Sequence, residues 1–127
     1  MRLLADTHIL IALAERTVLP GRLMKAMMDA DNALFASVAS LWEIAIKVRL
    51  GKLPLTRPLD AFPGFLERAR FSVIDISADH ALALAQPEPP TRDPFDRLLL
   101  AQCQVEGLRL VTVDRALAAH PLAWRET

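Results

Sequence analysis

The stretch "DPFDRLLLAQCQVEGLRLVTVD", residues 93 to 114, decides the fold because it holds one complete helix-to-strand unit. Asp93 and Pro94 are typical of the cap and the first position of a helix, and the helix that follows is apolar on nearly every side. Gly107 predicts the end of that helix. The run of residues 108 to 114, rich in β-branched residues, then predicts a strand of a parallel sheet.

The rest of the chain repeats this alternation of strand and helix. Apolar, strand-like runs occupy residues 2–6, 33–38 and 71–76. Helical spacing of apolar residues occupies residues 8–16, 22–30, 40–51 and, more weakly, 59–69, and it follows a capping serine over residues 78–86. Strands that alternate with helices favour an α/β fold with a parallel sheet covered on both faces.

Composition limits what the protein can be. At 127 residues the chain is expected to form one domain, residues 1–127, and to bury roughly two-thirds of its unfolded surface. Fifteen basic and fifteen acidic residues cancel, so no general basic field attracts nucleic acid. The hydrophobic fraction of 53% exceeds the usual proportion and suggests a surface that a partner covers.

The single cysteine and the N-terminal segment indicate a compartment. Cys103 has no possible disulfide partner in this chain, which favours a buried thiol in a reduced, cytoplasmic protein and excludes cysteine-based metal sites. Asp6, His8 and Glu15 interrupt the apolar N-terminus. We therefore expect neither a signal sequence nor a membrane-spanning segment.

Acidic residues occur at corresponding places along the predicted fold. Asp6 ends the first strand and Asp114 ends the last strand. Glu43 lies in the first or second turn of the helix after the second strand, while Asp93 and Asp96 begin the helix before the last strand. Because parallel strands have their carboxyl ends at one edge, all these acids should project toward that edge.

Each acid also has a purely structural explanation. Asp6 and Asp114 could cap the elements that follow them, and Glu43 could close a capping box with Ser40 or pair with Lys47. One acidic pocket explains the whole set more simply than separate caps do. Crowded carboxylates raise one another's pKa or require a cation, and an all-oxygen site suits Mg²⁺ or Mn²⁺.

Carboxylates that hold one or two such ions are suited to phosphodiester hydrolysis. The metal lowers the pKa of a bound water, positions it in line with the phosphorus and stabilises charge on the leaving oxygen. No side chain needs to act as the nucleophile.

Four segments, in this order and spacing, resemble the PIN-domain ribonucleases, particularly the VapC-type toxins of bacterial toxin–antitoxin pairs. They are "LLADTHILIALA", "SVASLWEIAIKVRLGKL", "RDPFDRLLLAQ" and "LRLVTVD". The resemblance implies a three-layer α/β/α sandwich whose central parallel sheet has four to five strands. It also implies Mg²⁺- or Mn²⁺-dependent endonucleolytic cleavage of RNA, a homodimer, and inhibition by a cognate antitoxin protein.

The same resemblance implies which acids bind metal. By position the family's metal-binding acids fall on Asp6, Glu43 and Asp96, with Asp114 as the usual fourth. Asp96 matches rather than Asp93, because Asp96 directly precedes the apolar run of the helix. Asp93 then keeps the capping role.

Three other side chains near these acids have two interpretations each. Thr112 matches a hydroxyl that is often found in the family, or it is an ordinary strand threonine. Trp42 and Phe95 could stack on bases, but their helical spacing favours packing in the core.

Two other classes of function remain open. A receiver-like, Mg²⁺-binding phosphoacceptor domain would share this layout but needs a lysine at the end of a late strand, where this chain has Asp114. A non-catalytic binding protein is the other alternative.

Overall fold

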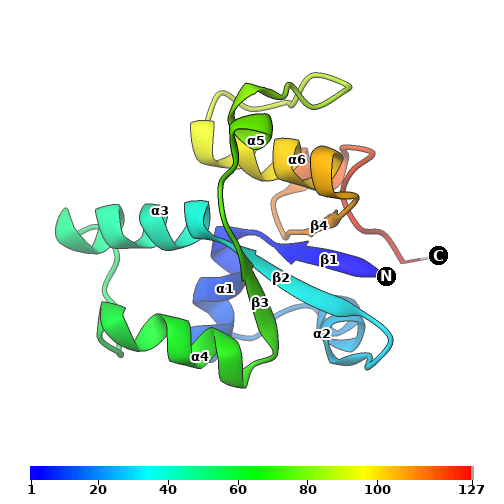
Figure 1. Ribbon diagram of the computed structural model, residues 1–127. Coiled ribbons are helices and arrows are strands. Elements are labelled where there is room, and N and C mark those ends of the chain that lie inside the picture. The colour runs from blue at the N-terminus through cyan, green and yellow to red at the C-terminus, as the bar shows by residue number, and fades with distance from the viewer. Residues whose placement is uncertain (127) are drawn as a thin grey trace.

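The computed structural model describes residues 1–126, so Thr127, the last residue of the predicted domain, lies outside the described residues. Its centre is a parallel sheet with the strand order β3-β2-β1-β4 (Figure 1). The strands are β1 (Arg2–Ala5), β2 (Ala33–Ser37), β3 (Phe71–Ile74) and β4 (Arg109–Val111). The predicted parallel sheet is confirmed, although β3 and β4 are shorter than the sequence pattern predicted.

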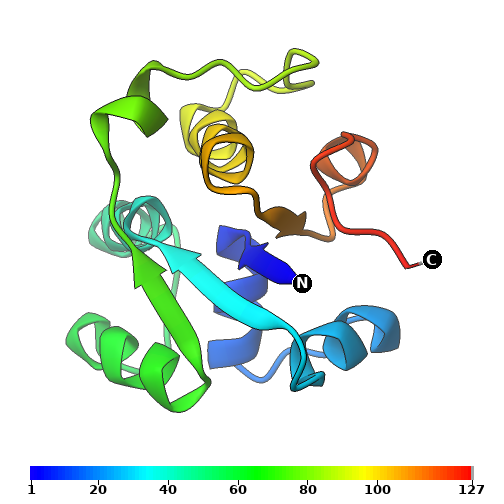
Figure 2. The ribbon, with the colours of Figure 1, turned by 45° about the vertical axis from the view of Figure 1, so that its right-hand side comes forward.

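Helices cover both faces of the sheet, as Figure 2 shows. They are α1 (Thr7–Ala14), α2 (Gly21–Met28), α3 (Val38–Arg49), η1 (Leu59–Ala61), α4 (Phe62–Arg68), α5 (Ala78–Leu82), α6 (Pro94–Glu106) and α7 (Arg115–Ala118). Helices α1, α2 and α4 lie on one face, and α5, α6 and α7 lie on the other (Figures 1 and 2). The three-layer α/β/α sandwich is therefore confirmed, with α3 extending beyond the carboxyl ends of the strands.

The core consists of two apolar clusters, one on each side of the sheet. Leu3 belongs to one cluster and Leu4 to the other, because successive side chains of a strand point to opposite faces. This two-sided burial explains why β1 is apolar from Leu3 to Ala5. Cys103 packs in the cluster under α6, and burial raises the pKa of its thiol to about 12, as expected for an inert, buried cysteine.

Both ends of α6 follow the predicted signals. Asp93 caps the helix through Oδ1, which accepts hydrogen bonds from the backbone N–H groups of Phe95 at 2.8 Å and Asp96 at 3.2 Å. Pro94 occupies the first turn, and Gly107 ends the helix with a φ of 68° in the left-handed region. The capping role predicted for Asp93 is confirmed.

Helix α5 is shorter than the helix predicted over residues 78–86. A distant side chain binds the backbone of residues 84 and 86, which follow α5. Gln104 Nε2 donates to the Leu84 carbonyl at 3.1 Å, and the Gln86 N–H donates to Gln104 Oε1 at 2.7 Å. These backbone groups are therefore satisfied in an extended conformation after Leu82. The short helix α7, which was not predicted, follows β4.

The C-terminal segment extends the sheet beyond β4. Leu110 pairs with Ala123 in an isolated parallel bridge, and the Trp124 N–H donates to the Leu110 carbonyl at 2.8 Å. The sheet thus agrees with the predicted four to five strands. Within residues 1–126, no helix combines the length and the apolar character needed to span a membrane.

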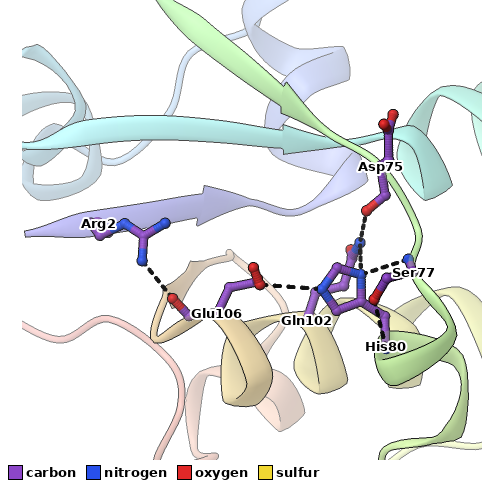
Figure 3. Close-up of polar contacts among 6 residues, drawn as sticks. All are labelled: Arg2, Asp75, Ser77, His80, Gln102 and Glu106. Carbon is purple, nitrogen blue, oxygen red and sulfur yellow. Dashed lines mark hydrogen bonds and ion pairs between the residues drawn. The ribbon is translucent and has the colours of Figure 1, made fainter.

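A polar network attaches α5 and the end of β3 to α6 (Figure 3). Ser77 and the buried His80 form a capping box, in which His80 Nδ1 accepts from the Ser77 N–H at 3.0 Å. Gln102 Nε2 donates to the Asp75 carbonyl at 3.2 Å, and His80 Nε2 lies 3.5 Å from Glu106 Oε2. These contacts fix the helix that carries Asp96.

Gly107 provides a test of this architecture. A Cβ at position 107 would meet no atom within 4 Å, so Gly107→Ala changes only the cost of the left-handed backbone. We expect a loss of about 1 kcal/mol of unfolding free energy and a fall of about 4 °C in Tm, measured by circular dichroism. Gly21→Ala, in the first turn of α2 and equally open, is the control and should not lower Tm. Equal Tm values for both variants would contradict the prediction.

Candidate functional site

The structure brings the four acids selected from the sequence to one edge of the sheet. Asp6 follows β1 and caps α1, and Asp114 follows β4 and caps α7. Glu43 lies on α3, and Asp96 lies in the first turn of α6. The charges of Asp6, Glu43 and Asp114 all help to raise the pKa of Asp96, so each of these three carboxylates lies within electrostatic reach of Asp96.

Asp96 is the half-buried member of this acidic group. Burial, followed by the charges of Asp93, Glu43, Asp6 and Asp114, raises its pKa from 3.8 to about 6. Both causes disfavour the carboxylate form. A cation close to Asp96 would oppose both of them.

Asp6 is almost completely buried, with 2% of its surface exposed. Burial raises its pKa, whereas the Thr112 hydroxyl and a hydrogen bond from the Ile9 N–H to Oδ1 at 2.9 Å oppose this rise. Thr112 Oγ1 also accepts from the Asp114 N–H at 3.0 Å. Thr112 therefore lies between the two acids that follow β1 and β4.

Glu43 has one engaged oxygen and one unsatisfied oxygen. Its side chain is 4% exposed, and Oε2 accepts from Lys47 Nζ at 2.7 Å. Oε1 is buried and has no hydrogen-bond partner among residues 1–126. The predicted pairing with Lys47 is confirmed, but the capping box with Ser40 is wrong because Ser37 caps α3. A buried carboxylate oxygen without a donor is costly, and a cation would satisfy it.

One pair of hydroxyls beside the acids was not identified from the sequence. Thr7 Oγ1 donates to Ser40 Oγ at 2.9 Å, and both side chains are buried. Thr7 directly follows Asp6, and Ser40 lies three residues before Glu43. The only available signal was the position of two small polar residues next to acids in apolar surroundings. Their bond holds α1 against α3 beside the acidic group.

The capping interpretation of the acids also holds, and it leaves room for a second role. Asp114 accepts from the Ala116 and Leu117 N–H groups through the same oxygen, Oδ1. Over the described chain, no three histidine, cysteine or acidic side chains lie close enough to form a complete metal-binding group. The acids are thus neighbours rather than a fully assembled ligand set, as expected for carboxylates that repel one another.

An aromatic pair lies next to the acids. The rings of Trp42 and Phe95 meet edge to face, with centroids 5.7 Å apart and an interplanar angle of 75°. The prediction that both rings pack in the core is wrong for Trp42, which is 58% exposed. Consecutive residues of a helix point about 100° apart, and Glu43 takes the inward direction, so Trp42 faces outward.

The raised pKa of Asp96 predicts how stability depends on pH. The folded protein holds this proton up to about pH 6, whereas the unfolded chain releases it near 3.8. In EDTA, the contribution of Asp96 to the unfolding free energy is therefore largest below pH 3.8 and is lost as the pH rises to about 6. Asp96→Asn removes this contribution. The Tm of wild type should therefore fall further than the Tm of the variant when the pH is raised from about 4 to about 7.

Asp31→Asn removes an exposed carboxylate outside the acidic group and is the control for this measurement. Parallel curves of Tm against pH for wild type and Asp96→Asn would contradict the raised pKa.

Comparison with known proteins agrees with this geometry. The PIN domain family matches residues 3–121, a range that contains all four acids. Ribonuclease VapC16 of Mycobacterium tuberculosis (strain ATCC 25618 / H37Rv) is 43% identical over 56 residues, which cover 43% of this chain and 38% of that protein. The matched segment thus spans well under half of that relative's length. The chain belongs to the PIN-domain family.

Proposed function

We propose that this protein is a metal-dependent endoribonuclease, the toxin of a bacterial toxin–antitoxin pair, which hydrolyses RNA phosphodiester bonds. The observation that carries the proposal is the meeting of four carboxylates from distant segments at one sheet edge, where a buried oxygen of Glu43 has no partner among the described residues. Membership of the PIN-domain family and the likeness to a protein named as a ribonuclease support it.

Asp6, Glu43, Asp96 and Asp114 would hold the metal. Carboxylate oxygens are the ligands that Mg²⁺ and Mn²⁺ prefer, and Glu43 Oε1 is a buried acceptor for such an ion. A bound divalent cation supplies the positive charge that activates water and stabilises the leaving oxygen in phosphodiester hydrolysis.

The chain's own residues hold these carboxylates in place. The Ile9 N–H holds Asp6, Thr112 fixes the turn at Asp114, and Lys47 orients Glu43 from the next turn of α3. Asp93 caps α6 and so presents Asp96 in its first turn. These contacts keep the carboxylates near one another, and a bound metal would draw them together into a complete ligand set.

The receiver-like phosphoacceptor domain has less support. Such a domain needs a lysine after its late strand, whereas Asp114 follows β4 here. An acid at that position repels a phosphoryl group unless a further cation is present.

Removing either central acid should abolish RNA cleavage. With total RNA and Mg²⁺ or Mn²⁺, wild type should produce fragments that EDTA prevents, whereas Asp6→Asn and Asp96→Asn should produce none. Each change replaces a carboxylate that would bind the metal with a neutral amide of nearly the same shape. Mn²⁺ at about 100 times its Kd should also stabilise wild type by about 2.7 kcal/mol, and this gain should be strongly reduced in Asp96→Asn.

Asp75→Asn is a matched control at an exposed acid beyond the end of β3 and should keep both cleavage and stabilisation by Mn²⁺. Cleavage at the wild-type rate by Asp96→Asn would reject the assignment of this residue.

The proposal includes a cognate antitoxin and a homodimer as partners, because many large apolar side chains are exposed. Within the described residues these are Met1, Val18, Met28, Trp42, Leu50, Val73, Leu82, Leu84, Val105 and Val113. A groove of ≈ 270 Å³ between α3 and α4, lined mainly by apolar residues that include Leu41 and Ile44, offers one seat for an apolar helix.

Blocking this groove should prevent formation of the complex. Co-expression with the small open reading frame beside the toxin gene should yield one peak of both proteins in size-exclusion chromatography. Ala45→Arg places a large cation in the α3–α4 groove and should separate the two proteins. Ala81→Arg, in a different groove between α5 and α6, is the control and should leave the complex intact. Separate elution of the wild-type proteins would contradict the proposed partner.

A further inference from the structure

We propose that Trp42 is the stacking platform for a base of single-stranded RNA next to the cleaved phosphate, and that Phe95 holds the indole ring in position. This inference rests on the proposed ribonuclease function and names how the substrate is held. It replaces the prediction from the sequence that Trp42 packs in the core.

The two rings belong to the same neighbourhood as the acids. Trp42 directly precedes Glu43 on α3, and Phe95 directly precedes Asp96 on α6. Helices α3 and α6 contact each other, and the two rings form part of that contact. Adjacent residues of a helix differ by about 1.5 Å in height and point about 100° apart, so each ring lies at the level of a carboxylate but to one side of it. A base that extends sideways from a phosphate at the carboxylates would therefore lie toward Trp42.

The geometry of the pair leaves an aromatic face open. An edge-to-face contact occupies at most one face of the indole, and 58% of Trp42 is exposed. Phe95 is only half-buried, so the pair forms a rim rather than part of the core. Contact with Phe95 restricts the ring before any ligand binds, which reduces the entropy lost on stacking. Every base has a π-face, so such a platform accepts single strands without a strict sequence.

Electrostatics favours a stacking contact at this site. The chain has zero formal net charge and the site is acidic, so phosphates gain little from a general field. Arg92 and Arg115, which are exposed beside the acids, could each contact a phosphate, but two other cations near the acids already have protein partners. Lys47 pairs with Glu43, whereas Arg97 lies 3.6 Å from Glu88 and donates to the Thr91 carbonyl. Stacking does not depend on charge, and it therefore supplies affinity where ion pairing is weak.

The decisive experiment measures RNA binding without cleavage. Asp96→Asn is the parent in every sample, and the probe is a fluorescent single-stranded RNA of about 12 nucleotides. Adding Trp42→Ala should raise the Kd roughly 5- to 140-fold, which corresponds to 1–3 kcal/mol for one lost stacking contact. Trp42→Phe keeps an aromatic face and should retain most of the affinity. Leu50→Ala, an exposed apolar residue at the end of the same helix, should leave the Kd unchanged.

A second experiment measures the intrinsic fluorescence of Trp42. The chain has two tryptophans, so Trp124→Phe leaves Trp42 as the single reporter. RNA should quench its fluorescence, and the same RNA with abasic sites at the bound nucleotides should not. With the abasic RNA, Trp42→Ala should cause no further loss of affinity.

Several results would overturn the inference. If wild type cuts RNA and Trp42→Ala binds and cuts it equally well, stacking is wrong while the ribonuclease function stands. If wild type neither binds nor cuts RNA, the proposed function fails first and the inference fails with it. If Trp42→Ala instead converts a dimer into a monomer by size-exclusion chromatography with light scattering, a second copy of the chain covers the ring.

Discussion

Mutual repulsion of carboxylates at one edge of a parallel sheet is the constraint on which the rest of this structure depends. The carboxyl ends of parallel strands lie at the same edge of the sheet. Asp6 and Asp114 follow two neighbouring strands, β1 and β4. Helices α3 and α6 add Glu43 and Asp96 to the same place. Such a group is unfavourable in a folded protein unless something compensates its charge. Lys47 compensates part of it, and the unsatisfied Oε1 of Glu43 remains.

Much of the surrounding structure serves to keep these acids where they are. The capping bonds of Asp6, Asp93 and Asp114 use backbone N–H groups at helix starts, where negative charge is favoured. Behind them, two apolar clusters press the helices against the sheet. The network around His80 and Gln102 attaches α6 to α5 and to the end of β3 (Figure 3). Each of these capping bonds uses Oδ1 alone. The other oxygen of the same carboxylate is therefore available to bind a cation.

The sequence was sufficient for the parallel sheet, the limits of α6 and the meeting of the acids, because each follows from local signals and from the direction of parallel strands. It was insufficient where a distant side chain decides the outcome. Helix α5 stops at Leu82 because Gln104, on another helix, binds the following backbone. Trp42 is exposed because Glu43 takes the inward direction on α3. Apolar periodicity cannot show that a carboxylate, rather than an indole, is buried.

The central claim is that a divalent cation belongs among these carboxylates. Anomalous diffraction from crystals grown with Mn²⁺ tests it most directly, since the signal locates the ion without assumptions about activity. We predict an anomalous peak among Asp6, Glu43, Asp96 and Asp114. Well-ordered carboxylates at this edge with no peak among them, at a Mn²⁺ concentration that supports RNA cleavage, would contradict the account.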